Sequence, residues 1–153
     1  MAEGIPSQGT PTISRVSPDW PLLRPDGTMR DVVTVRLPAE PAYLAVLRTT
    51  TASLAARLDF TIDEIEDLRI AVDEACGLLL ADSHPRAELT SVFELSDDTI
   101  QVTVSTEHGR APSRDTFAWA VLSALAGGVD SWRDSEGRQS IALVKHRGSE
   151  ETA

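Results

Sequence analysis

The sequence predicts an α+β fold, a two-layer sandwich with a mainly antiparallel sheet and helices gathered on one face. Three observations lead to this prediction. Short stretches alternate apolar and polar residues, as strands do, and longer stretches repeat apolar residues every three or four positions, as helices do. Two pairs of the predicted strands are joined by short polar turns, which suits antiparallel pairing. Helices on one face of such a sheet bury both kinds of apolar stripe.

The first strand is predicted at residues 31–37, where alternating Val33, Val35 and Leu37 form the better-buried side and Pro38 ends the strand. A helix follows, with a proline tolerated in its first turn. Its apolar stripe recurs at spacings of three and four, at Leu44, Leu47, Thr51, Leu54 and Leu58.

The second helix is predicted to begin at Thr61. Thr61 and Glu64 have the spacing of a capping box, in which each side chain accepts a hydrogen bond from the other residue's backbone N–H. The stretch 83–85 (Ser-His-Pro) ends this helix. Its predicted core stripe consists of Ile65, Leu68, Val72, Cys76 and Leu79.

The second half of the chain predicts a hairpin, a short helix and a closing pair of strands. The predicted ranges are 89–95 and 99–106 for the hairpin, 116–126 for the helix, and 129–133 and 140–146 for the last two strands. A glycine pair after residue 126 ends the helix.

The length of 153 residues, 41% of them hydrophobic, suits one domain. We expect residues 1–30, rich in proline, glycine and serine, to form a flexible segment, and 148–153 to form a loose tail. The folded domain is then 31–147. The sequence WPLL at 20–23 is apolar enough to dock on this domain or on a partner.

Composition argues against several kinds of partner. The net charge of −10 repels nucleic acids and anionic membrane surfaces. No apolar run approaches the roughly 20 residues of a membrane span, and the N-terminus lacks signal-peptide features. Cys76 is the only cysteine, and the three histidines are not spaced as metal ligands. We therefore expect a cytoplasmic protein without a metal site.

One acidic residue and one acidic face on the second helix are candidates for function. Glu74 shares a mainly apolar strip with Ile70 and Leu78, so it could be a desolvated general base. The alternative is that Glu74 lies at the edge of the stripe with its carboxylate in solvent. The acidic face formed by Asp63, Glu64, Glu66 and Asp67 is either simply solvated or a docking surface for a basic partner.

Two stretches carry a resemblance to a known family. DLRIAVDEACGLLL (67–80) and FAWAVLSALAGGVDSW (117–132), with the predicted strands between them, resemble the RsbW-type anti-sigma factors and serine kinases. These proteins belong to the histidine-kinase-like (GHKL) ATPase superfamily, and the chain looks most similar to actinobacterial members. The resemblance covers about 31–146 and implies the histidine-kinase-like ATPase (Bergerat) fold.

The resemblance also implies where a nucleotide site would lie and how it has changed. The family's catalytic glutamate corresponds to Glu74, and its Mg²⁺-binding asparagine corresponds to Leu78, which has no oxygen to offer a hard cation. In VSTEHGRAP (104–112), which replaces the family's D-x-G-x-G box, the nucleotide-binding candidates are Thr106, Glu107 and Gly109. Thr106 takes the place of the adenine-binding aspartate, with Glu107 a substitute one position on. Residues 116–119 replace the glycines of the nucleotide lid. We therefore expect no cofactor.

The function implied by the resemblance is that of an anti-sigma factor in a bacterial partner-switching system of the stress-response type. It would sequester an RNA polymerase sigma factor and be released by an anti-anti-sigma protein of the STAS type. The candidate contact residues are Arg48, Arg57, Asp63, Glu64, Glu66 and Asp67. Homodimerisation through the edge of the first strand is also implied.

Two other functions stay open at this point. The alternative within the family is an active serine kinase that phosphorylates its anti-anti-sigma antagonist, with ATP and Mg²⁺ as cofactors and Glu74 as base. Whether the protein is an enzyme depends on which alternative holds. The third class is a metabolic enzyme or small-molecule binding module built on the same sheet.

Overall fold

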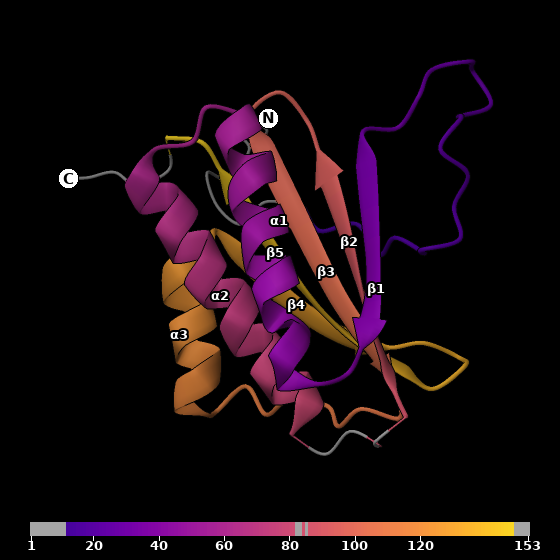
Figure 1. Cartoon of the computed structure of the whole chain (residues 1–153), viewed down its shortest axis with the longest axis vertical. Coiled ribbons are helices and arrows are strands. Elements are labelled where there is room, and N and C mark those ends of the chain that lie inside the picture. Colours follow the sequence, from indigo (N-terminus) through magenta and orange to yellow (C-terminus); the bar gives the residue numbers. More distant parts are fainter. Residues whose placement is uncertain (1–11, 82–83, 85, 149–153) are drawn as a thin grey trace, which may run out of the picture.

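The computed structural model describes residues 12–81, 84 and 86–148, which form a two-layer α+β sandwich. Three helices cover one face of a five-stranded sheet (Figure 1). The strand order is β1-β2-β3-β5-β4, and all four neighbouring pairs are antiparallel. This architecture confirms the fold class predicted from the sequence. No helix in the described part of the chain is long and apolar enough to cross a membrane.

The predicted elements form in the predicted order. A 3-10 turn, Pro41–Tyr43, precedes the first helix. The bounds, which differ from the predicted ones by one or two residues, are β1 Val32–Pro38, α1 Leu44–Arg57, α2 Ile62–Leu80, β2 Glu88–Leu95, β3 Thr99–Glu107, α3 Phe117–Leu125, β4 Gly128–Arg133 and β5 Arg138–His146. Most of the predicted C-terminal tail, and residues 1–11 of the N-terminal segment, lie outside the described residues.

The core lies between the sheet and the helices, and α2 runs through its centre. Leu68, Val72 and Leu79 of α2 are at most 1% exposed and belong to the same cluster as the inward residues of β3 and β5. Cys76 lies in this row as well, and burial raises the pKa of its thiol to about 12. The thiol therefore packs as an apolar group.

The predicted capping box is present at the start of α2. Glu64 N donates to Thr61 Oγ1 at 3.1 Å, and Thr61 N donates to Glu64 Oε1 at 2.8 Å. The second carboxylate oxygen, Oε2, accepts from the backbone N of Gly148 at 2.6 Å. Glu64 is only 2% exposed, so the prediction that it belongs to a solvent-facing acidic surface is corrected. Its carboxylate instead ties the end of the sheet to the start of α2.

The face of the sheet away from the helices is partly covered by residues 12–31, which we call the strap. The strap passes behind the sheet and forms a lobe beside β1 (Figure 1). Ser14 and Gln101 of β3 pair like two amides, since Ser14 N donates to Gln101 Oε1 at 2.9 Å and Gln101 Nε2 donates to Ser14 O at 2.7 Å. Val16 is 9% exposed.

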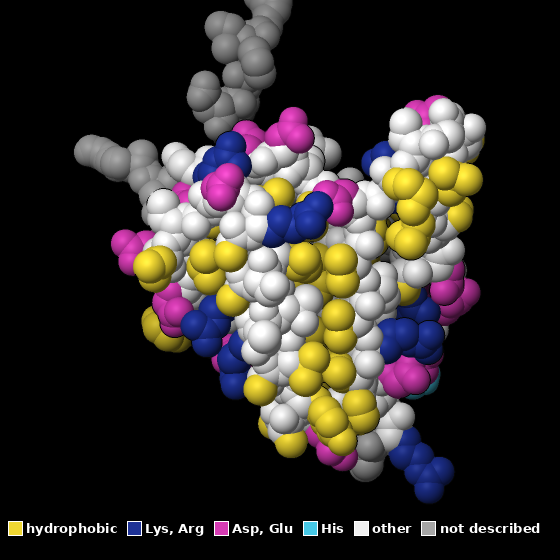
Figure 2. All heavy atoms as spheres, turned by 45° about the horizontal axis from the view of Figure 1, so that its top comes forward, with side chains coloured by type: hydrophobic (Ala, Val, Ile, Leu, Met, Phe, Trp, Pro, Cys, Tyr) yellow, Lys and Arg dark blue, Asp and Glu magenta, His cyan; other side chains and the backbone are white. Residues whose placement is uncertain are grey.

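The lobe of the strap presents hydrophobic side chains to solvent. Figure 2 shows them gathered at the upper right of the molecule, and the large exposed residues here are Trp20, Leu22, Leu23 and Met29. The WPLL sequence therefore lies mostly on the surface. Arg30 stacks on the Trp20 ring at 4.9 Å from its centroid.

We predict that Glu64→Ala lowers the free energy of unfolding by about 1–3 kcal/mol, because it removes a helix cap and leaves Gly148 N without its acceptor. Urea denaturation followed by circular dichroism measures the change. The matched control is Glu66→Ala on the next turn, whose carboxylate is exposed beside Arg69. This control should change stability by less than about 0.5 kcal/mol. Equal effects would contradict the role given to Glu64.

The same residue gives a pH dependence. Burial raises the pKa of Glu64, but hydrogen bonds from Thr61 and Gly148 outweigh it, so the net pKa lies below the ordinary value of 4.5. A lowered folded-state pKa stabilises the protein above pH 4.5 and loses this contribution as the pH falls. The stability difference between the native protein and Glu64→Gln should therefore shrink as the pH is lowered from 7 towards 3.

Candidate functional site

Glu74, the predicted catalytic base, lies on the second half of α2 and is half-buried. Among the described residues its carboxylate has no hydrogen-bond or ion-pair partner. Leu78, one turn further on, packs against the hydrophobic core. The pair therefore presents one carboxylate and one apolar side chain where a Mg²⁺ site needs several oxygens. No three histidine, cysteine or acidic side chains in the described part of the chain are grouped to hold a metal ion.

The end of β3 brings together two of the three predicted nucleotide-binding residues. Thr106 is 2% exposed, and its hydroxyl donates to the carbonyl oxygen of Glu88 on β2 at 2.9 Å. Gly109 lies directly against it, since a Cβ atom built on Gly109 would be 2.7 Å from Thr106 Cγ2. The same atom would lie 3.7 Å from Leu79 of α2. The space beside Thr106 is therefore filled by the protein's own backbone.

An arginine that the sequence analysis missed holds this loop in place. Arg133, at the end of β4, donates from Nη2 to Gly109 O at 2.6 Å and from Nη1 to Gly137 O at 3.1 Å. His108 N also donates to Gly137 O, at 3.1 Å. The loop after β3 is thus bonded to the turn between β4 and β5. Nothing in the sequence near Arg133 distinguishes it from other surface arginines.

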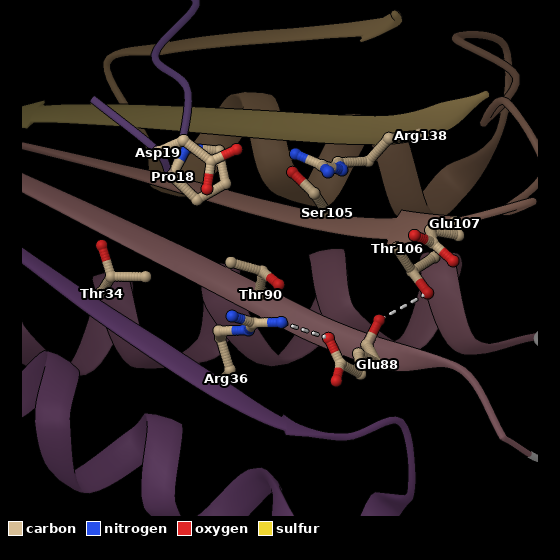
Figure 3. Close-up of a pocket in the computed structure, with 10 residues that line it drawn as sticks. All are labelled: Pro18, Asp19, Thr34, Arg36, Glu88, Thr90, Ser105, Thr106, Glu107 and Arg138. Atoms are coloured by element: carbon tan, nitrogen blue, oxygen red, sulfur yellow. Dashed lines mark hydrogen bonds and ion pairs between the residues drawn. The ribbon is translucent and has the colours of Figure 1, made fainter. Parts of the chain in front are cut away.

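The third predicted residue, Glu107, lies on the opposite side of the sheet. Successive strand residues point to opposite faces, so Glu107 shares the open face with Ser105 whereas Thr106 points towards the helices. Figure 3 shows Glu107 at one end of a polar pocket that also contains Arg36, Glu88 and Arg138. Thr106 also lines this pocket, and the substitution of Glu107 for the family's aspartate stays a prediction.

The region that replaces the nucleotide lid is a capped helix start. Thr116 Oγ1 accepts from Trp119 N at 3.2 Å and donates to Ser113 O at 3.0 Å. Arg114 stacks on the Trp119 ring at 4.6 Å and donates to Asp130 of β4 at 3.0 Å. The Thr116 cap thus uses one backbone N–H of the first turn of α3, that of Trp119, which would otherwise be available for a phosphate.

Asp130 is the anionic centre of this group. Burial raises its pKa, but hydrogen bonds from Arg114 and Ser131, together with the charge of Arg15, outweigh burial and leave the pKa below its ordinary value. Arg15 of the strap lies 3.6 Å from Asp130 and stacks on the Trp132 ring. Asp130 therefore contacts both the strap and the loop that precedes α3.

The predicted partner-contact residues are divided between surface and interior. Arg57, Asp63 and Glu66 are exposed on the helix layer. Asp67 is half-buried and lies 3.7 Å from Lys145. The Arg48 guanidinium donates to both carboxylate oxygens of Asp73 at 2.9 and 3.0 Å, joining α1 to α2. Glu64 is buried, as described above.

These features define the class of the protein. The layer of helices on an antiparallel sheet, with Glu74 on the central helix, is the arrangement of a histidine-kinase-like ATPase domain. The residues present do not fit Mg-ATP. Leu78, which corresponds to the family's Mg²⁺-binding asparagine, has no oxygen to offer the cation, and the Thr106 hydroxyl is already hydrogen-bonded to the carbonyl oxygen of Glu88. The loop residue Gly109 also occupies the space beside β3.

Comparison with known proteins identifies the family: the chain belongs to the RsbW family. It is 35% identical over 143 residues to a Mycobacterium tuberculosis protein named anti-sigma-F factor RsbW, covering 87% of this chain and 83% of that relative. It is also 35% identical over 80 residues to the Bacillus subtilis serine-protein kinase RsbW, covering 50% of each. The match thus spans about half the length of the Bacillus relatives.

A solved structure shows the same fold. The crystal structure of the RsbU and RsbW domains of a Mycobacterium tuberculosis protein aligns with 79% of this chain and 34% of that chain. The TM-score is 0.61 at 13% sequence identity, so this likeness concerns the fold alone. No family model matches the sequence.

We predict that Gly109→Ala destabilises the protein by about 1–3 kcal/mol, because its Cβ would overlap Thr106 Cγ2. Thr106→Ser removes this methyl group and keeps the hydroxyl, so the double variant should recover at least about 0.5 kcal/mol in a double-mutant cycle. Thermal and urea unfolding measure both values.

The control for this cycle is Gly77→Ala on α2, where a Cβ would meet nothing within 4 Å. This change should stabilise the helix by up to about 1 kcal/mol. A Gly109→Ala variant as stable as the native protein would show that the loop after β3 does not fill the space beside Thr106.

Proposed function

We propose that the protein is an anti-sigma factor that binds and sequesters an RNA polymerase sigma factor. The observation that carries the proposal is the alignment, along most of both chains, with a relative named anti-sigma-F factor RsbW. Glu74, the candidate base, has no hydrogen-bond or ion-pair partner among the described residues, and binding to a protein surface requires no catalytic group.

The electrostatics of the helix layer support a basic partner. The helix layer includes the stretch of residues 40–74, and the exposed carboxylates of this stretch include those of Asp63 and Glu66.

 This stretch has eight acidic residues, of which only Glu64 is buried, and three arginines. The acidic residues are Glu40, Asp59, Asp63, Glu64, Glu66, Asp67, Asp73 and Glu74. A surface of this sign attracts a positively charged, DNA-facing surface of a sigma factor, and covering that surface would keep the factor from its promoter.

The proposed activity does not use a nucleotide. Leu78, the bonded hydroxyl of Thr106 and the capped start of α3 each take away one contact that Mg-ATP would need. These losses favour the anti-sigma role over the alternative, an active serine kinase that phosphorylates its antagonist. Release would then depend on competition between partners.

We further propose that a STAS-type anti-anti-sigma protein is the competitor, in the cytoplasm, and that the chain forms a homodimer. The outer edge of β1 supports the dimer, because β1 ends the sheet and pairs only with β2 among the described strands. Its unpaired backbone groups are able to extend the sheet into a second copy.

The test of the main proposal is reconstitution with purified sigma factors from the same organism. We expect one of them to form a stable complex in native gels and to lose run-off transcription when the protein is added. Complex formation without any loss of transcription, or no complex with any of these sigma factors, would contradict the proposal.

The contribution of charge is tested with Asp63→Lys combined with Glu66→Lys. We expect the association rate with the sigma factor to fall at least tenfold at low salt, because two exposed carboxylates that steer a basic partner are reversed. Surface plasmon resonance at increasing ionic strength measures the rate, and the difference should narrow as salt screens the charges.

The matched control for the charge reversal is Glu107→Lys combined with Glu136→Lys, away from the helix layer. This control changes the net charge by the same amount but leaves the helix layer unchanged. Its association rate at low salt should therefore fall much less than that of the Asp63→Lys, Glu66→Lys variant, and at high salt it should stay close to that of the native protein. A fall equal to that of the helix variant would show that only net charge matters.

Nucleotide binding is predicted to be absent or weaker than about 1 mM. Each lost charged hydrogen bond weakens binding by about 10- to 100-fold. Titration calorimetry with Mg-ATP checks this value on the full chain. A dissociation constant in the low micromolar range, together with phosphate transfer to the antagonist, would instead support the kinase alternative.

A further inference from the structure

A pocket lies between the strap and the open face of the sheet, on the side of the sheet opposite Glu74. It has a volume of about 330 Å³, at the lower end of the range of about 300–1,000 Å³ for small-molecule sites. Its walls are mostly apolar, and the apolar residues that line it include Val16, Trp20 and Leu22 of the strap and Val32 and Val92 of the sheet.

One carboxylate, that of Glu94 on β2, lines this pocket without a partner. Glu94 is half-buried, and among the described residues it makes no hydrogen bond and no ion pair within 4.0 Å. Burial raises the pKa of Glu94, although the charges of Arg30 and Arg24 oppose this effect. A carboxylate that is half-buried without gaining a partner is a group that a ligand can satisfy.

The two nearby arginines are occupied within the strap. Arg30 donates from Nε to Pro21 O at 2.9 Å and stacks on Trp20. Arg24 donates to Thr28 Oγ1 at 3.2 Å and to Met29 O at 3.1 Å. These contacts hold the lobe of the strap together, so Glu94 is the charged residue lining this pocket that has no hydrogen-bond or ion-pair partner among the described residues.

We propose that this pocket binds a small amphipathic amine, with its ammonium group on the Glu94 carboxylate and its apolar body against the valines of strap and sheet. An anionic ligand would meet the like charge of Glu94, and a neutral one would leave that carboxylate desolvated and unpaired. A folded partner is too large for a space of this volume. The proposal is independent of the anti-sigma function.

Such a ligand would touch both sides of the pocket and so fix the strap on the sheet. Val16 and Trp20 come from the strap, whereas Val32 and Val92 come from the two strands beneath it. Binding therefore stabilises the docked strap by mass action, by an amount that grows with the logarithm of the ligand concentration above the dissociation constant.

The experiment is an NMR titration of the ¹⁵N-labelled full chain with 2-phenylethylamine, 2-phenylethanol and phenylacetate, which share one apolar body. We expect the amine to bind about 10- to 100-fold more tightly than the alcohol, with shift changes at Thr34, Val92 and Glu94. In hydrogen exchange, the amine should slow exchange of the strap amides. Equal binding of amine and alcohol, or stronger binding of phenylacetate, would overturn the proposal.

Two variants and one control locate the binding. Glu94→Gln keeps the shape of the pocket and should abolish the preference for the amine. Thr34→Leu adds apolar volume at the pocket wall and should weaken all binding. Glu107→Gln removes a carboxylate from the same face of the sheet outside this pocket, and it should change nothing. An amine preference that survives Glu94→Gln in a folded variant would refute the assignment.

Discussion

The packing of α2 across the middle of the sheet is the constraint on which the other elements depend. Leu68, Val72 and Leu79 lie in one row and are almost completely buried against β3, β5 and the two other helices. Each fully buried side chain of this kind contributes about 1.5–3 kcal/mol relative to an exposed one. Since α2 fills the centre, α1 and α3 can only lie on either side of it, as Figure 1 shows. The same helix carries Glu64 in its first turn and Glu74 in its second half.

The region that corresponds to the family's nucleotide site is formed by the end of β3, the loop at Gly109 and the start of α3. Here internal contacts take the place of ligand contacts. Thr106 bonds to Glu88, the loop at Gly109 is held by Arg133, and Thr116 caps α3. In each case a group that could face a ligand is satisfied by the protein itself. This region therefore keeps the fold of the family, and its polar groups stabilise the protein. The geometry favours binding of a protein partner at the surface as the function.

The sequence predicts the elements well because their apolar periodicity is strong and their ends are marked by caps, prolines and glycines. It predicts the capping box at Thr61 and Glu64 for the same local reason. It does not predict that Glu64 is buried, because the covering group, Gly148, is 84 residues away in the chain. Arg133 and the pairing of Ser14 with Gln101 are missed for the same reason. Contacts between distant residues leave no periodic pattern.

Glu107 shows a different limit of sequence reasoning. A shift of one position keeps a carboxylate near the expected place along the chain but moves it to the other face of the sheet. Alternation along β3 therefore separates the side chain of Glu107 from that of Thr106. Thr106 and Gly109 lie against each other, next to Leu79 of α2, and their role in nucleotide binding stays a prediction.

The two faces of the sheet differ in how firmly they are covered. The helix layer is held by the continuous core, whereas the strap is held by Val16, the pairing of Ser14 with Gln101, and Arg15 near Asp130. The side chain of Arg15 is 62% exposed, so its ion pair contributes little. Segments with few buried contacts open at the lowest free energy. The loop before α3 is held more firmly, because Arg114 and Thr116 both make hydrogen bonds there. Among the described residues, the strap is therefore the segment that a ligand or a partner can most easily move.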